Sequence, residues 1–185
     1  KILTEAIDEL KENEFKELYH KEAEKTGEFV SDCVLETDLE ILIPDDYVID
    51  IAERLSIYRE LDNLSTEVEL EDYKLKLQDR FGELPRQTQD LFDALRLRRM
   101  AKEIGFEKLM LKSEKLIANF VSNAESAYFQ SSAFTRVLDF IKDNPPGYKM
   151  YEKGNGLRLS KVGVRTINDA IATLVALHLE NEPVS

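Results

Sequence analysis

Few residues of this chain have the types and spacing that nucleophilic catalysis requires. Such a site needs a serine or cysteine, a histidine base and an orienting acid, and the sequence has one cysteine, Cys33, and two histidines, His20 and His178. His20 lies in a highly charged segment, and His178 lies on the apolar stripe of a predicted C-terminal helix. A lone histidine in either setting is far more often solvated or structural than catalytic. Cys33 falls on the inner side of a predicted strand, so we expect it to pack as a small hydrophobic residue.

Carboxylates offer a second kind of chemistry, because Asp45, Asp46 and Asp50 could supply oxygen ligands to a divalent cation. Neither the spacing of an EF-hand loop nor a Cys/His cluster accompanies them. Asp45 and Asp46 also precede a predicted helix, where a carboxylate caps free backbone N–H groups and offsets the helix dipole. We therefore favour helix capping by one of these two residues, and a small acidic metal-dependent enzyme is the alternative.

Phosphate binding would need a glycine-rich loop that leads from a strand into a helix, with a lysine near the phosphates. Gly154-Asn155-Gly156 instead lies between two predicted strands, so it indicates a hairpin turn. We expect no ATP site and no cofactor in this chain.

A basic run, Arg96, Arg98, Arg99 and Lys102, lies on the outer face of a predicted helix. The charge of the chain is uneven, since residues 1–72 hold 23 acidic and 7 basic residues whereas residues 73–185 hold 14 and 18. DNA phosphates would repel the acidic half. We therefore expect the run to balance charge within the domain, and direct DNA binding by the Arg96–Lys102 face is the alternative.

The elements that position these residues follow from the spacing of the apolar residues. Strict alternation predicts a strand from Cys33 to Ile43, and period-two segments around Ser113-Glu114 and Gly154-Asn155-Gly156 predict two hairpins. Helical periodicity predicts helices over about residues 48–61, 66–81, 85–104, 131–143 and 167–178. The order indicates an α+β fold in which antiparallel hairpins form a sheet packed against several helices.

The second of these helices has clear sequence signals at both ends. Thr66 followed by Glu69 is a capping box. Gly82 stands where a left-handed C-terminal cap belongs. Leu77 and Phe81 are expected to anchor the end of the helix inward. The next helix is expected to start at Pro85 and to stop at Gly105.

The sequence predicts a helical tail or linker for residues 1–28 and a single domain for residues 29–185. Because the chain begins with Lys1, we expect it to be a piece of a longer protein. No stretch reaches the roughly 20 apolar residues of a membrane-spanning helix, and a single cysteine fits a reducing compartment. We expect a cytoplasmic protein without a membrane partner.

Three segments together resemble one known family. They are ILIPDDYVIDIAERLSIYREL (41–61), DRFGELP (79–85) and LFDALRLRRMAKEIGFEKL (91–109). Their order and spacing resemble the C-terminal domain of bacterial transcription-repair coupling factors. The leading KILTEAIDEL also resembles the end of the helicase-like motor that precedes this domain in the family.

The resemblance implies a regulatory tail of an ATP-dependent, double-stranded DNA translocase that removes stalled RNA polymerase and recruits nucleotide-excision repair. The ATP and Mg²⁺ of such a protein belong to its motor. In the resting protein the tail packs on the UvrB-like N-terminal module of the same chain and covers the surface that UvrA needs.

By position in the family motif, the resemblance assigns Asp79 and Arg80 to that interdomain contact. Lys76 lies one turn before Asp79, where family members can carry an acid. The expected site is therefore an interface made of Asp79, Arg80 and Lys76, with no catalytic, cofactor or metal residues.

Overall fold

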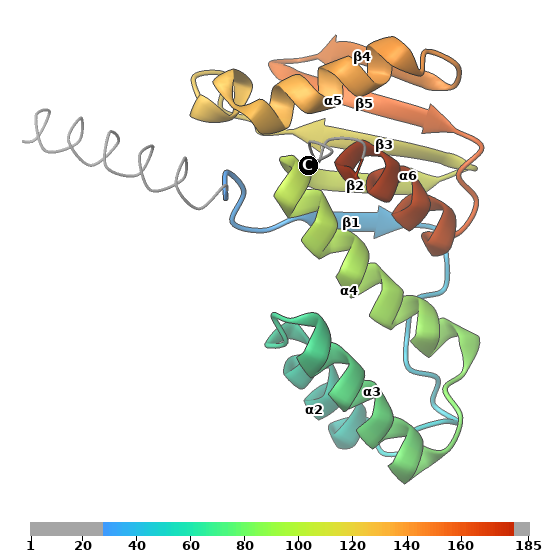
Figure 1. The fold of residues 1–185 in the computed structure, drawn as a ribbon. Helices are drawn as coiled ribbons and strands as arrows, with labels where there is room; N and C mark the ends of the chain where they lie inside the picture. The colour runs from blue at the N-terminus through green and yellow to red at the C-terminus, as the bar shows by residue number, and fades with distance from the viewer. Residues whose placement is uncertain (1–27, 180–185) are drawn as a thin grey trace, which may run out of the picture.

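The computed structural model describes residues 28–179, which form a sheet lobe and a helical lobe joined by one long helix (Figure 1). The helical tail predicted for residues 1–28 lies outside this range, except for its last residue. None of the described helices is both long enough and apolar enough to cross a membrane.

The sheet lobe contains five strands in the order β1-β2-β3-β5-β4. Their bounds are β1 Val34–Thr37, β2 Phe106–Lys112, β3 Lys115–Phe120, β4 Tyr148–Lys153 and β5 Gly156–Val162. The pairs β2–β3, β3–β5 and β4–β5 are antiparallel, and β1 is parallel to β2. This mixed, mostly antiparallel sheet with helices packed on it confirms the predicted α+β class.

Both hairpins form where the sequence predicts them. Ser113 and Glu114 have φ angles of 52° and 58°, which match the backbone of a two-residue turn that follows strand twist. At the second hairpin Lys153 pairs with Gly156, so Gly154 and Asn155 make the turn.

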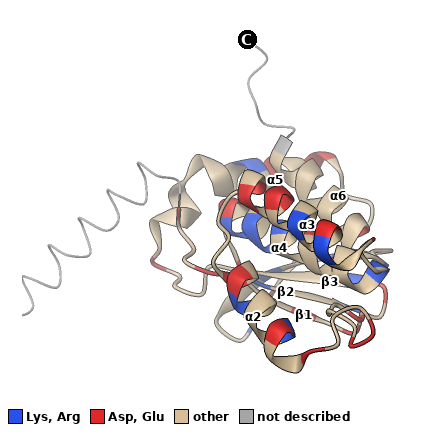
Figure 2. Ribbon diagram, turned by 90° about the horizontal axis from the view of Figure 1, so that it is seen from below, with Lys and Arg blue, Asp and Glu red and all other residues tan. Residues whose placement is uncertain are grey.

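One face of the sheet carries helices α4 (Arg86–Ile104), α5 (Ser132–Asp143) and α6 (Ile167–Leu179) (Figures 1 and 2). A short 3-10 helix, η1 (Ala127–Gln130), precedes α5 and has no clear signal in the sequence. Its Tyr128 lies at the centre of an aromatic cluster with Phe29, Phe120, Phe129 and Phe134. The core of this lobe therefore lies between the sheet and these helices.

The helical lobe consists of α2 (Ile51–Asp62), α3 (Glu67–Phe81) and the start of α4. Its separate core is made of buried apolar residues from the three helices, the preceding loop and the α3–α4 loop: Ile43, Val48, Ile57, Leu61, Leu70, Leu77, Leu84 and Phe92. Further along α4, Leu97, Ala101 and Ile104 belong to the core of the sheet lobe. A single continuous helix thus contributes to both cores.

The long strand predicted from Cys33 to Ile43 is wrong beyond Thr37. The Leu39 amide donates to Thr37 Oγ1 (3.1 Å), and further on Thr88 Oγ1 donates to the Leu42 carbonyl (3.2 Å). The segment leaves the sheet and crosses to the helical lobe, where Ile43 is buried. The apolar residues alternate because this connecting segment, residues 38–50, contacts first one core and then the other. We call this segment the strap.

The start of α2 corrects a second prediction. The carboxylate of Asp50, rather than that of Asp45 or Asp46, accepts from the Glu53 amide (2.8 Å) and caps the helix. Ile51 and Leu55, whose spacing in the sequence fits an apolar helical stripe, are 67% and 50% exposed, whereas Ile57 is buried.

Candidate protein-interaction surface

Helix α3 carries the three predicted interface residues, and both of its ends are held by specific contacts. At its start, Thr66 Oγ1 accepts from the Glu69 amide (3.2 Å) while the Glu69 carboxylate accepts from the Thr66 amide (3.0 Å). This reciprocal pair is the predicted capping box. Such pairs satisfy N–H groups that the first turn of a helix otherwise leaves free.

The end of α3 is held by Tyr47, which lies on the strap before α2. The Tyr47 hydroxyl donates to the carbonyls of Gly82 (2.9 Å) and Leu77 (3.3 Å), and its ring lies 5.8 Å from that of Phe81. Gly82 ends the helix with φ 89° and ψ −166°, so the predicted positive φ is present, although the conformation is not left-handed helical. The Asp79–Arg80 turn is therefore fixed to its own lobe.

A groove of about 370 Å³ runs between α2 and α3. It is lined by Glu53, Ser56, Ile57, Glu60, Tyr73, Lys76, Leu77, Arg80 and Phe81. Burial, together with the hydrogen bond and charge of Glu60, raises the pKa of Tyr73 above its ordinary value. Apolar and charged side chains thus line the groove together, which is a common composition for a small protein-binding surface.

Arg80 makes contacts within the domain. Its guanidinium forms an ion pair with Glu53 of α2 and lies 4.9 Å from the centre of the Phe81 ring. Its side chain is still 65% exposed. A partner can therefore reach Arg80 but must share it with Glu53.

Asp79 differs from Arg80, because no residue of the described part of the chain makes an ion pair or hydrogen bond with its carboxylate. Its side chain is exposed, and so is that of Lys76 one turn earlier on the same side of α3. The structure thus brings the three predicted residues to one end of one helix. All three side chains are exposed, and that of Asp79 is a carboxylate without a partner among the described residues.

Sequence reasoning missed two residues of this surface, Tyr47 and Glu53. Glu53 lies on a different helix from Arg80, and nothing local in the sequence signals that pairing. Tyr47 can be seen in the sequence as an aromatic residue shortly before Asp50. Its contact with α3, however, depends on how the strap folds back.

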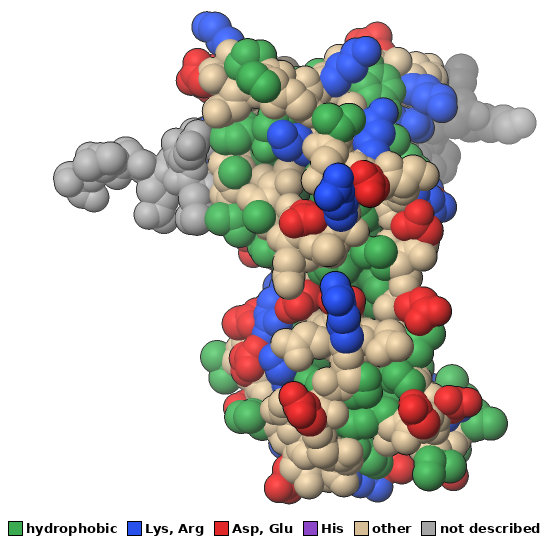
Figure 3. Space-filling model, turned by 90° about the vertical axis from the view of Figure 1, so that its right-hand side faces the viewer, with side chains coloured by type: hydrophobic (Ala, Val, Ile, Leu, Met, Phe, Trp, Pro, Cys, Tyr) green, Lys and Arg blue, Asp and Glu red, His purple; other side chains and the backbone are tan. Residues whose placement is uncertain are grey.

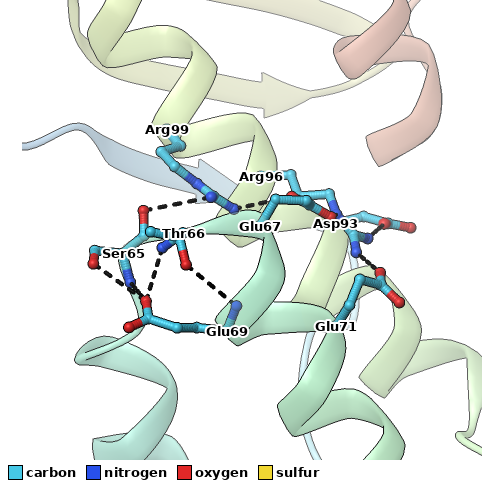
Figure 4. Close-up of polar contacts among 8 residues, drawn as sticks. All are labelled: Ser65, Thr66, Glu67, Glu69, Glu71, Asp93, Arg96 and Arg99. Atoms are coloured by element: carbon cyan, nitrogen blue, oxygen red, sulfur yellow. Dashed lines mark hydrogen bonds and ion pairs between the residues drawn. The ribbon is translucent and has the colours of Figure 1, made fainter.

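The basic run on α4 pairs with acids of the same domain (Figure 4). Arg96 contacts Asp93 (2.7 Å), Glu67 (2.6 Å) and Glu71. Arg99 contacts Glu67 (3.2 Å). Partial burial opposes the charged form of Arg96, but hydrogen bonds and charges of Glu67 and Asp93 outweigh it and raise the pKa of its guanidinium.

Arg98 extends the same arrangement toward the sheet. It donates to the Cys33 carbonyl (2.7 Å) and to Asp32 (3.0 Å). These contacts agree with the predicted charge balance within the domain. Arg96, Arg98 and Arg99 are therefore already in ion pairs, and these are three of the four cations that DNA binding by the Arg96–Lys102 face would use.

The residues considered for chemistry do not form a site in the described part of the chain. Cys33 is fully buried, and burial raises the pKa of its thiol to about 12, which disfavours the reactive thiolate. His178 is exposed and lies 3.9 Å from Glu103; its expected place on the apolar stripe is therefore wrong. His20 lies outside the described residues.

The metal-site alternative also lacks the geometry that it would need. Asp50 is used as a helix cap, while Asp45 and Asp46 are exposed. Within residues 28–179, no three His, Cys, Asp or Glu side chains are placed to share a cation.

The described architecture is thus a helical pair joined through one long helix to a mixed, mostly antiparallel sheet. The chain belongs to the TRCF domain family, whose model matches residues 37–131. This range includes the helical lobe, all of α4 and the first hairpin.

The relatives are transcription-repair-coupling factors. The chain is 36% identical over 108 residues to that of Escherichia coli (strain K12), a match that covers 58% of this chain and 9% of the relative. It is 29% identical over 129 residues to that of Rickettsia bellii (strain RML369-C), covering 70% and 11%. The chain thus spans about a tenth of the length of these relatives.

A solved structure supports the fold. The crystal structure of the C-terminal domain of transcription-repair coupling factor matches with a TM-score of 0.62, over 82% of this chain and 96% of that chain. The identity is 16%, so this likeness bears on the fold.

Proposed function

We propose that this chain is a non-catalytic regulatory domain of a transcription-repair coupling factor. It docks on the UvrB-like N-terminal module of the same protein and covers the surface that UvrA needs. The whole protein would be an ATP-dependent DNA translocase that acts on stalled RNA polymerase and duplex DNA, with ATP and Mg²⁺ bound by its motor. Family membership supports this assignment.

The observation that carries the docking proposal is the exposed carboxylate of Asp79 at the fixed end of α3, which has no partner among residues 28–179. A surface that competes with a second partner benefits from side chains on rigid elements and from charge complementary to its target. Tyr47 and Phe81 supply the rigidity. We expect Asp79 to contact a cationic patch on the UvrB-like module. Lys76 and Arg80, which lie beside Asp79 on α3, would face acidic groups at the edge of that patch.

The direct test measures binding of this chain to the isolated UvrB-like module by calorimetry. Asp79→Lys should weaken binding about 10-fold or more, since it replaces attraction by repulsion. Asp139→Lys is the matched control, because Asp139 is an exposed carboxylate on α5 of the other lobe and should bind like the unaltered chain.

A second test uses the whole protein. Removing the domain should increase the affinity for UvrA, and Asp79→Lys in the whole protein should do the same to a smaller extent. Unchanged UvrA affinity in both proteins would contradict masking, even if the isolated parts bind one another.

A further inference from the structure

The sheet has one face that no described helix covers. In Figures 1 and 2 the helices α4, α5 and α6 lie on the same side of the sheet, and the opposite side is bare of described elements. Burial agrees with this view, since Leu109, Leu111 and Leu159 of the covered side are buried. The side chains that alternate with them are mostly exposed or half-buried.

The bare side is rich in cations. Strand register places on it Lys108 and Lys112 of β2, Lys115 of β3, Arg158 of β5, and Lys149 and Lys153 of β4. We name these six residues the lysine face. Cationic side chains also gather on the upper, sheet-bearing part of the molecule in Figure 3.

Few acids offset these charges. Glu36 of β1 pairs with Lys108 (2.6 Å) and Lys112 (3.5 Å). Glu107 stands at a register shift beside Lys108. The other four cations, Lys115, Lys149, Lys153 and Arg158, make no ion pair with any residue of the described range. The net charge of the chain is −12. A cluster of cations that have no acidic partner among the described residues is therefore unusual, and it favours an anionic partner.

The composition of the face distinguishes between two kinds of anionic partner. Lysine is depleted in protein–protein interfaces, because burying its ammonium is costly and its flexible chain must be ordered. Lysine is well suited to phosphate, which it contacts as a point charge without losing all its water. Five of the six cations are lysines, so the face fits a phosphodiester backbone better than an acidic protein surface.

The spacing and position of the cations are also suitable. They spread over four adjacent strands, β2, β3, β5 and β4, a width of about 14 Å at ordinary strand spacing. Acidic residues of α2 and α3 lie in the other lobe (Figure 1). Repulsion from charges farther than about 10 Å is largely screened at moderate salt.

We propose that the lysine face binds the phosphate backbone of nucleic acid without sequence specificity. The contact is separate from the α3 end and does not depend on the proposed docking there. Tyr151, next to Arg158 in the strand register, gives single-stranded nucleic acid one aromatic ring for stacking.

The test measures fluorescence anisotropy of labelled duplex DNA, and of a single strand of equal length, with the 185-residue chain. If four phosphates are neutralised on a duplex, affinity should fall roughly 100-fold between about 50 mM and about 200 mM salt. The variant Lys115→Glu/Lys149→Glu/Arg158→Glu should lose binding at least 10-fold.

The matched control is Arg59→Glu/Lys74→Glu/Lys142→Glu, which changes the net charge equally at positions away from the face. Binding retained by the control and lost in the face variant supports the proposal. Equal loss in both variants would show that overall charge, rather than this face, is responsible.

Lysine acetylation footprinting tests the same contact in the unaltered chain, so its result does not depend on whether a variant folds. Bound DNA should protect Lys115 and Lys149 but not Lys74 and Lys142.

Absence of binding to either nucleic acid at low salt overturns the proposal. Protection by polyglutamate but not by DNA also overturns it and assigns the face to an acidic polypeptide. Tighter binding of the single strand than of the duplex would identify the preferred form.

Discussion

At the scale of single residues, Gly105 is required both by its backbone conformation and by its neighbour. It ends α4 with φ 108°, and an added Cβ would overlap the Tyr128 ring. That ring is buried, and its hydroxyl donates to the Ile104 carbonyl (2.7 Å), so it cannot move aside without losing a buried hydrogen bond. Gly105 therefore fixes how closely the η1 segment approaches α4.

We expect Gly105→Ala to lower the free energy of unfolding by about 2–5 kcal/mol, from backbone strain together with overpacking. Gly154→Ala is the control, because Gly154 also has a positive φ, of 63°, but nothing lies near the position of an added Cβ. Gly154→Ala should lower the free energy of unfolding by only about 1–2 kcal/mol. Equal losses for the two variants in urea unfolding would show that the Tyr128 contact is unimportant.

The Arg80–Glu53 ion pair is exposed enough to contribute little to stability. The Arg80 side chain is 65% exposed and that of Glu53 26%, so water and salt screen their attraction. A double-mutant cycle with Arg80→Ala and Glu53→Ala should give a coupling energy under about 1 kcal/mol. A coupling several times larger would mean that Glu53 holds Arg80 too firmly for it to serve a partner.

At the scale of elements, the capping box of α3 is the feature that sequence reasoning predicted most completely. Thr66→Ala removes the acceptor of the Glu69 amide and should cost about 1 kcal/mol of unfolding free energy. Ser56→Ala on an exposed face inside α2 should change it by less than about 0.5 kcal/mol. Chemical denaturation of both variants decides whether the cap matters.

Helix α6 has a similar box, which the sequence analysis did not identify. The Asp169 carboxylate accepts from the amides of Arg165 and Thr166 (3.0 Å each). Hydrogen bonds from backbone amides lower the pKa of both Asp169 and Glu69. The signal T-x-x-D was present in the sequence, since Thr166 precedes Asp169 by three residues.

These caps give stability a definite dependence on acid. A carboxyl whose pKa is lowered by folding adds stability above its unfolded pKa, and that stability is lost as pH falls through the folded value. Unfolding free energy should therefore fall below about pH 4. In Glu69→Gln/Asp169→Asn this fall should be shallower than in the unaltered chain, whereas in Glu152→Gln it should not change. An unchanged slope in the double variant would contradict the role of the caps.

The remaining elements show where sequence reasoning works and where it stops. Turn and cap residues act on their own neighbours, so both hairpins, the start of α5 at Ser131 and the ends of α3 and α4 follow from local chemistry. The strap after Thr37 carries strand-like alternation because it contacts two cores in succession. Which element a residue faces across the fold is not encoded in its neighbours, and this is why the Glu53–Arg80 pair was not foreseen.

At the scale of the whole molecule, the two cores differ in size. The sheet lobe buries most of the apolar residues, whereas the helical lobe buries a small set contributed by three helices and two loops. Regions with fewer buried contacts open locally at lower free energy. The helical lobe should therefore be the less stable part.

Native-state hydrogen exchange tests this expectation. Amides of α2 and α3 should exchange through openings of lower free energy than amides of β2 and β3. Ion pairs between α3 and α4, such as Arg96 with Glu67, should make the difference larger in high salt, because salt screens them. Equal protection in all four elements would show that both lobes unfold as one unit.

Helix α4 links the two proposed contact surfaces, the end of α3 and the lysine face. Its 19 residues measure about 28 Å in helical form, and its two halves are embedded in different cores. Because α4 is one continuous helix, it couples the orientation of the helical lobe to that of the sheet. A partner that grips the helical lobe thereby sets the direction in which the lysine face points.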